Sequence, residues 1–349
     1  MLRKTLVAAA SLAVVATVTA LAAPALARDQ IRAVGSSTVF PFMTAVAEAF
    51  GRTTGRKTPV VESTGTGGGF RLFCAGIGDA HPDITGASRA ITAAEKATCK
   101  NNGVTDVVEV KIGYDGIVLA NARQAPLMQL TVAQLWQALA KEVPDAQGQL
   151  VRNPARMWSD IDRSLPAKRI EVMGPPPTSG TRDAFVELVM TPGCAANPAM
   201  RAIQQANAAR YNAACNTMRE DGAWIDAGEN DILIVRRLQA NTDAFGVFGY
   251  SFLQENADQV QGSVIGGVKP EFDTIAAGKY PVSRPLFFYV KKQHMSGVAP
   301  GIDAFLREWT EERTWGPDGY LADRGLIPLP DAERSTQRAS ARALTLIGM

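Results

Sequence analysis

The chain has 349 residues, of which 46% are hydrophobic and 20% are charged, and it carries 36 basic against 34 acidic side chains. This composition is typical of a globular protein and excludes a long disordered chain. The near balance of charge gives no electrostatic basis for binding nucleic acid.

Residues 1–27 have the pattern of a secretory signal peptide. Arg3 and Lys4 precede an apolar run over residues 6–21, and Ala25-Leu26-Ala27 is a small-residue cleavage site. A membrane anchor is the alternative, but the run is short and no basic flank follows it. Removing residues 1–27 leaves 34 basic side chains against 34 acidic ones. We therefore expect a protein exported to the periplasm, with cleavage near Ala27.

The rest of the chain alternates apolar β-branched runs with helical patterns. Phe42, Val46 and Phe50, for example, repeat every four residues and form one helix face. Strands are expected near residues 31–34, 59–62, 84–87, 107–110, 117–120, 169–173, 245–250 and 284–290, and helices at 130–139, 232–238 and 300–309. The tail, residues 331–349, is polar and is expected to be loosely held. The alternation predicts an α/β architecture, and the length predicts two lobes.

Three Ser/Thr/Gly clusters each open a stretch with helical spacing. They are Gly35-Ser36-Ser37-Thr38, Thr64-Gly65-Thr66-Gly67-Gly68-Gly69 and Thr178-Ser179-Gly180-Thr181-Arg182-Asp183. A helix N-terminus leaves backbone N–H groups unpaired and carries about +0.5 of an elementary charge. Three such ends aimed at one point would hold a small tetrahedral anion, so the clusters predict oxyanion binding. Each cluster could also be an ordinary helix cap or loop.

Four cysteines, Cys74, Cys99, Cys194 and Cys215, fit an oxidising compartment. Four cysteines allow three pairings. Pairing neighbours in sequence, Cys74 with Cys99 and Cys194 with Cys215, would close one local loop in each half of the chain. A zinc site is not expected, because the spacing is wrong and neither His81 nor His294 stands beside a cysteine.

With these clusters in order, the chain resembles the phosphate-binding proteins of ATP-driven phosphate importers, the PstS family. The resemblance covers nearly all of the mature chain. Its motifs are Gly35–Pro41, Gly65–Phe70, Asp83–Arg89, Gly113–Gly116, Ser179–Thr181, Gly228–Asp231 and Phe248–Tyr250. It implies a type II periplasmic binding protein fold, in which two α/β lobes joined by two crossovers close on a phosphate in the cleft between them. The expected division is 28–116 plus 246–330 for lobe 1, 117–245 for lobe 2, and 331–349 for the C-terminal tail.

The resemblance also implies which residues bind the ligand. It assigns phosphate contacts to Ser37, Thr38, Val39, Thr66, Gly67, Ser88, Arg89, Ser179, Gly180 and Thr181, with Arg182 as a second cationic candidate. In the best-known members an Asp stands where this chain has Arg89, and an Arg stands where it has Pro175. The basic group has therefore changed sides of the site, and a guanidinium there can bind two oxygens of an anion.

Selectivity against sulfate needs a group that accepts the phosphate proton. In members that carry the Asp, that carboxylate is the acceptor. Here Asp83, Asp115, Asp183, a backbone carbonyl or a hydroxyl could take the role, and the sequence does not choose among them.

The sequence thus predicts a monomeric binding protein without cofactor or metal, which captures inorganic phosphate and delivers it to the membrane permease of an ABC transporter. Sulfate or a phosphonate is the first alternative ligand. The second alternative is a secreted phosphoesterase that uses Ser179. An enzyme is disfavoured because Ser179-Gly180-Thr181 does not match the Gly-x-Ser-x-Gly motif and no histidine lies inside a cluster.

Overall fold

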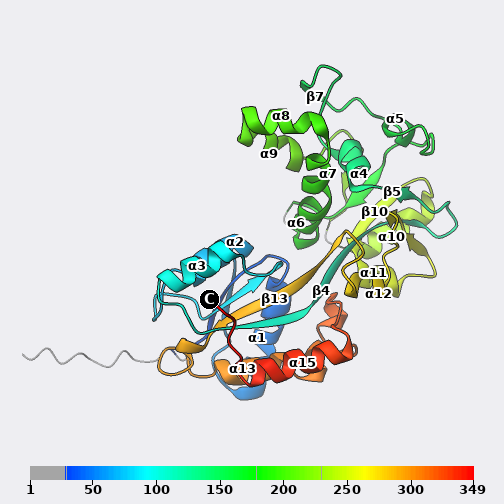
Figure 1. Cartoon of the computed structure of the whole chain (residues 1–349). Helices are drawn as coiled ribbons and strands as arrows, with labels where there is room; N and C mark the ends of the chain where they lie inside the picture. The colour runs from blue at the N-terminus through cyan, green and yellow to red at the C-terminus, as the bar shows by residue number, and fades with distance from the viewer. Residues whose placement is uncertain (1–27, 29, 178, 229) are drawn as a thin grey trace, which may run out of the picture.

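A computed structural model describes residues 28, 30–177, 179–228 and 230–349, so the predicted signal peptide lies outside the described residues. The chain forms two α/β lobes connected by long strands (Figure 1). The α-helices are α1 (Phe40–Thr54), α2 (Thr66–Phe73), α3 (Ala93–Asn101), α4 (Val132–Leu139), α5 (Trp158–Ile161), α6 (Gly180–Phe185), α7 (Thr191–Ala195), α8 (Pro198–Ala206), α9 (Ala208–Asn216), α10 (Asp231–Ala240), α11 (Tyr250–Glu255), α12 (Phe272–Ala276), α13 (Ile302–Trp309), α14 (Glu312–Trp315) and α15 (Asp331–Arg342).

The strands are β1 (Arg32–Gly35), β2 (Val60–Ser63), β3 (Ile84–Ala87), β4 (Val107–Ala122), β5 (Gln129–Leu130), β6 (Glu142–Pro144), β7 (Leu150–Arg152), β8 (Val172–Gly174), β9 (Trp224–Asp226), β10 (Phe245–Gly249), β11 (Val260–Gly262), β12 (Val264–Ile265) and β13 (Ser283–Lys291). A π-helical segment, η1 (Val186–Met190), joins α6 to α7, and two short 3-10 turns are η2 (Lys292–His294) and η3 (Ala322–Arg324). Strands and helices therefore alternate through most of the chain, as the sequence predicts.

Lobe 1 is built on the strand order β2-β1-β3-β13-β4, in which β1, β2 and β3 are parallel and β13 is antiparallel to its two neighbours. Successive side chains of β13 enter two separate cores, one on each face of the sheet. Phe288 packs with α1 and α13, whereas Phe287 and Tyr289 pack with Phe70 and Phe73 of α2. Both faces of this sheet are thus covered by helices.

Lobe 2 continues the same curled sheet through β10, β8 and β9, while β11 pairs with β4. Its core contains the buried side chains of Trp136, Trp158 and Phe248. The helix α4 begins where the sequence predicts, because Thr131 and Gln134 form a reciprocal capping box. Asn230 likewise caps α10, because its side chain accepts from the N–H of Ile232.

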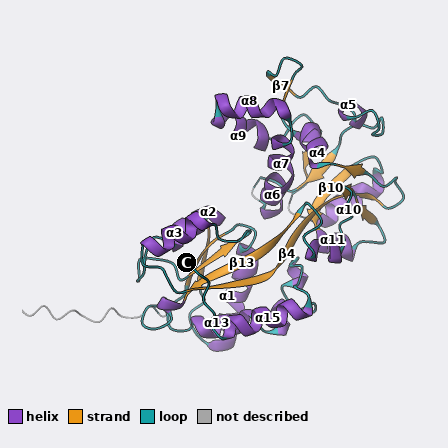
Figure 2. Cartoon of the chain, in the orientation of Figure 1, coloured by secondary structure: helices purple, strands orange, loops and turns teal. Residues whose placement is uncertain are grey.

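Two strands, β4 and β13, carry the chain between the lobes (Figure 2). The first part of β4 pairs with β13, and its last part pairs with β10 and β11. Residues 246–282 were expected in lobe 1, but Val260, Ile275 and Val282 lie in the core of lobe 2. The expected boundary at residue 246 is therefore wrong, and the return crossing occurs at β13. Apolar periodicity identifies β10 but not which lobe it joins.

Both disulfides join neighbouring cysteines, so the local pairing is confirmed. Cys74, just after α2, is bonded to Cys99 in α3, and Cys194 in α7 is bonded to Cys215 in α9. One bridge therefore lies in each lobe. The first ties the end of α2 to α3, and the second ties α7 to α9 across the intervening α8.

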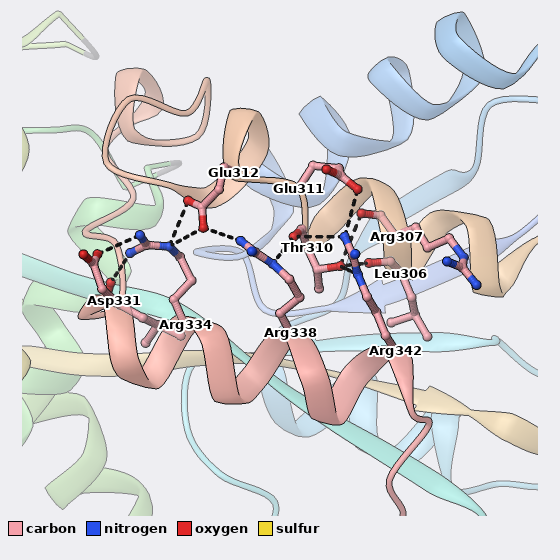
Figure 3. Close-up of polar contacts among 10 residues, drawn as sticks. Leu306, Arg307, Thr310, Glu311, Glu312, Asp331, Arg334, Arg338 and Arg342 are labelled. Carbon is pink, nitrogen blue, oxygen red and sulfur yellow. Dashed lines mark hydrogen bonds and ion pairs between the residues drawn. The ribbon is translucent and has the colours of Figure 1, made fainter.

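The C-terminal tail is held against lobe 1, in contrast to the expectation of a loosely held segment. Residues 331–342 form α15, whose Arg334, Arg338 and Arg342 are spaced by four residues and face the α13–α14 region (Figure 3). Beyond this helix, the backbone N–H of Ile347 donates to the carbonyl of Val107 at 2.9 Å. The sequence misleads here because arginine ion pairs, which a polar segment does not reveal, attach the helix together with the buried Ala341.

Candidate functional site

The first cluster connects β1 to α1 through a turn that requires glycine. Gly35 has a φ of 128°, and a Cβ there would lie 2.2 Å from the carbonyl oxygen of Gly86. The chain then places the Ser36 hydroxyl as acceptor of weak bonds from the backbone N–H groups of Thr38 at 3.2 Å and Val39 at 3.4 Å. The start of α1 therefore presents backbone donors that are only loosely satisfied within the protein.

The third cluster starts α6 in lobe 2, and it meets the first cluster. Ser179 is the N-cap, and its Oγ accepts from the N–H of Thr181 at 3.3 Å. A Cβ added to Gly180 would lie 3.4 Å from the carbonyl oxygen of Ser37. The starts of α1 and α6, which belong to different lobes, are therefore neighbours. Thr178, the first residue of this cluster, lies outside the described residues.

Arg284 of β13 is a site residue that the sequence analysis missed. Its side chain is 6% exposed, and its Nη2 donates to Thr38 Oγ1 at 2.8 Å. Its Nε donates to Asp115 Oδ2 at 3.4 Å, and its Nη1 donates to Glu187 of η1. Arg284 lies directly opposite Asp115 in the β13–β4 pairing. That register brings a cation beside the first cluster, and no local motif marks it.

Asp115 is the carboxylate most affected by the cleft. Its side chain is 15% exposed, and desolvation raises its pKa, with Glu187 adding to the shift and Arg284 opposing it. The sequence analysis left Asp115 as one of several proton acceptors. In the structure Asp115 lies at the cleft, whereas the carboxylate of Asp83 is hydrogen-bonded to Arg28 and to His294.

A cavity of about 650 Å³ lies between the lobes at these residues. Five of its lining residues are predicted ligand contacts, namely Ser37, Thr38, Ser179, Gly180 and Thr181, and Asp115, one of the candidate proton acceptors, lines it as well. Asp231, Glu255 and Asp323 also line it, together with Arg324. The wall is therefore not generally basic, so attraction for an anion has to come from directed N–H groups and from individual cations such as Arg284.

The second cluster and the residues after β3 form another contact group. Thr66 begins α2, and its Oγ1 lies 3.0 Å from Ser88 Oγ and accepts from the Ser88 N–H at 3.1 Å. The guanidinium of Arg89 is held by both carboxylate oxygens of Glu95 at 2.8 Å. That hydrogen-bonded pair raises the pKa of Arg89. An oxyanion at Arg89 would therefore compete with Glu95.

Arg182 packs against an aromatic side chain within lobe 2. Its guanidinium lies 4.4 Å from the ring centroid of Trp224, and burial lowers its pKa. It lines a separate cavity of about 480 Å³, together with Asp183 and Glu187. Of the other predicted contacts, Val39 is the N-cap residue of α1 and Gly67 lies in the first turn of α2, so both stand at helix starts.

Two lobes joined by crossing strands, with helix starts facing each other across a cleft, define a two-lobed solute-binding protein. Residues 20–313 match the model of the PBP superfamily domain. The chain belongs to the PstS family of phosphate-binding proteins, because it is 30% identical over 269 residues to the phosphate-binding protein PstS of Staphylococcus epidermidis, covering 75% of this chain and 68% of that one.

Two further likenesses cover more of the chain. Protein SphX of Synechocystis is 29% identical over 320 residues, which is 88% of this chain and 81% of that protein. The crystal structure of a possible phosphate-binding protein from Planctomyces limnophilus superposes with a TM-score of 0.72 at 28% identity, covering 91% of this chain and 99% of that one. The type II two-lobe fold expected from the sequence is thereby confirmed.

Proposed function

We propose that this protein captures inorganic phosphate in the cleft between its lobes and delivers it to the permease of an ABC importer. The observation that carries the proposal is the meeting of the α1 and α6 starts beside the buried guanidinium of Arg284. Backbone N–H groups at both helix starts favour a small anion. A buried guanidinium adds charge-assisted hydrogen bonds to an anion.

The proposed inner contacts are the hydroxyls of Ser37, Thr38 and Ser179 and the backbone N–H groups of Val39, Gly180 and Thr181. Thr66, Gly67, Ser88 and Arg89 form an outer group on lobe 1, which would join the site if lobe movement or release of Glu95 brings them to the ligand. Arg182 is the weakest candidate for a phosphate contact, because its guanidinium packs on the ring of Trp224 and lines another cavity.

Asp115 is the proposed acceptor of the phosphate proton. It lines the cleft and accepts a hydrogen bond from Arg284, whereas Asp83 is held by Arg28 and His294. An ionised Asp115 can accept a hydrogen bond from a protonated phosphate oxygen but not from sulfate, which has no proton at neutral pH. The pairing with Arg284 keeps the carboxylate oriented toward this task.

Capture requires no covalent step. Ser179 would need a base to act as a nucleophile. The two histidines lie elsewhere, since His294 contacts Asp83 and the ring of His81 lies against Gly76. We further propose that the protein is exported to the periplasm after cleavage near Ala27 and acts as a monomer. Within the described part of the chain, no helix has both the length and the apolar character needed to cross a bilayer.

Calorimetric titration of the purified protein with phosphate and with sulfate tests the proposal. Phosphate binding at micromolar concentrations or below, with sulfate much weaker, is the expected result. Millimolar or absent phosphate binding would sink it, and equal sulfate binding would point to a general oxyanion carrier. Hydrolysis of a chromogenic phosphoester, lost in Ser179→Ala, would instead indicate a phosphoesterase.

A further inference from the structure

Two carboxylates of lobe 2 reach across to lobe 1 from one helical run. The segments α6, η1 and α7 are consecutive, so residues 180–195 form a continuous helical stretch with a π-helical segment inside it. Asp183 and Glu187 stand four residues apart on this stretch, which places them on the same side. Asp183 Oδ2 accepts from the Ser37 hydroxyl at 3.0 Å, and Glu187 accepts from Arg284.

These two contacts engage groups that an oxyanion would also use. Ser37 stands at the start of α1, and Arg284 is the buried cation beside it. The Glu187 side chain is 54% exposed, whereas that of Arg284 is 6% exposed, so a solvent-accessible carboxylate meets a buried cation. Glu187 also attracts Arg89, since its charge adds to the effect of Glu95 in raising the pKa of Arg89. The carboxylate of Glu187 is thus paired with Arg284 and adds to the negative potential at Arg89.

We propose that Glu187 is an internal substitute for the bound anion: its carboxylate occupies Arg284 in the empty cleft, and an entering oxyanion must displace it. Asp183 accepts from the Ser37 hydroxyl in the same way, and the two carboxylates together hold the lobes in contact when no oxyanion is bound. This proposal rests on the proposed function, because it takes phosphate as the anion that replaces the carboxylates.

In such an exchange the guanidinium of Arg284 replaces one anionic acceptor with another. Arg284 keeps its bonds to Thr38 and Asp115, so only the donor facing Glu187 changes partner. A carboxylate and a phosphate oxygen accept from a guanidinium in similar geometry. The buried cation is thus never left unpaired, which would be costly. The carboxylate of Glu187, as part of the chain, also sets a minimum binding free energy for the entering anion. A weakly bound monoanion gains too little to displace it.

The first test measures phosphate affinity by calorimetry in the wild type and in Glu187→Gln, which removes the charge and keeps the shape. We expect Glu187→Gln to bind phosphate roughly threefold more tightly or better, the scale of an ion pair with one exposed partner. The matched control is Glu142→Gln, which breaks a lobe 2 surface pair with Arg210 and should leave the affinity unchanged. An unchanged or weaker affinity in Glu187→Gln overturns the proposal.

A second test does not depend on any ligand. Small-angle X-ray scattering of the ligand-free full chain compares the wild type with Asp183→Ala/Glu187→Ala, after circular dichroism has verified that both are folded. Loss of the two cross-lobe contacts should increase the radius of gyration, and identical scattering overturns the proposal. If the wild type binds no phosphate, the proposed function fails, while the scattering comparison still decides whether these carboxylates hold the lobes.

Discussion

The guanidinium of Arg284 donates a 2.8 Å hydrogen bond to the hydroxyl of Thr38, across a sequence separation of 246 residues. Thr38 belongs to the first helix start of lobe 1, and Arg284 belongs to the strand that returns the chain to that lobe. Asp115, opposite Arg284 on β4, completes the group. Helix start, return strand and outgoing strand are therefore tied together at the base of the cleft.

Replacing Thr38 with Val should weaken phosphate binding about tenfold. The substitution removes a hydroxyl that faces the cleft and leaves a buried guanidinium donor without its partner, and hydrogen bonds to charged groups contribute about 1.5–3 kcal/mol. Titration calorimetry would measure the change. Thr53→Val in the same helix is the matched control, because the Thr53 hydroxyl donates to the backbone carbonyls of Ala49 and Phe50 in its own helix. Equal affinities in the two variants would remove Thr38 from the site.

Local patterns predicted the helix starts well, because each depends on residues close in sequence. Gly35, Thr66 and Ser179 all lie where a strand or loop turns into a helix, as expected. Arg284 was not predicted, since its place beside Thr38 depends on the antiparallel register of β13 on β4. Register is set by long-range packing, and a single arginine in an apolar strand carries no motif.

The same distinction explains the errors in organisation. The boundary at residue 246 was wrong because periodicity in β10 shows that a strand exists, but not that its partners are β4 and β8. The expectation of a loosely held tail was wrong because α15 attaches mainly through ion pairs of its arginines, which apolar periodicity does not reveal. Cysteine pairing, by contrast, joined neighbours in sequence, and the simplest local assignment was right.

Asp115→Asn should reduce the preference for phosphate over sulfate by about tenfold, because an amide can donate to a sulfate oxygen whereas an ionised carboxylate repels it. The pH dependence gives a second readout. Desolvation raises the pKa of Asp115 above its usual 3.8, so protonation removes the acceptor at a higher pH than for an exposed Asp. Phosphate affinity in the wild type should therefore fall as the pH drops toward that raised value.

The Asn variant should lack this component of the pH profile. Parallel titrations of both proteins with phosphate and sulfate, between about pH 8 and pH 4.5, give the comparison. Phosphate itself changes charge over this range in the same way for both proteins, so the difference between them isolates Asp115. Superimposable profiles with unchanged selectivity would assign the acceptor role to another group.

Arg334→Met should lower the free energy of unfolding by about 1–3 kcal/mol, because it leaves the carbonyl of the buried Leu329 without its donor. The Arg334 side chain is 7% exposed and donates to the Leu329 carbonyl at 2.6 Å and to both Glu312 oxygens at 3.1 and 3.2 Å (Figure 3). Urea denaturation followed by circular dichroism measures the loss. Arg52→Met, at a side chain that is 71% exposed, should change stability by less than about 0.5 kcal/mol. Equal losses would mean that the arginine contacts of α15 do not stabilise the lobe.

Lys291→Met should change the pH dependence of stability above neutral pH. Lys291 is fully buried, its Nζ donates to the Gly76 carbonyl at 2.7 Å, and desolvation lowers its pKa from 10.5 to about 7, with Asp83 opposing the shift. Between these two values the unfolded chain binds a proton that the folded chain does not, so wild-type stability rises with pH over that window. Below about pH 7 both states carry the charge, and the cost of burying it is present in full.

The melting temperature of Lys291→Met relative to the wild type should therefore be highest near pH 6–7 and fall steadily toward pH 10, because only the wild type gains from deprotonation. Differential scanning calorimetry of both proteins at matched pH values measures this difference, and other titrating groups cancel in it. Lys292→Met, one residue along the chain and partly exposed, is the control and should show a constant offset. A constant offset for Lys291→Met as well would mean that the buried ammonium is solvated or paired in the folded protein and keeps an ordinary pKa.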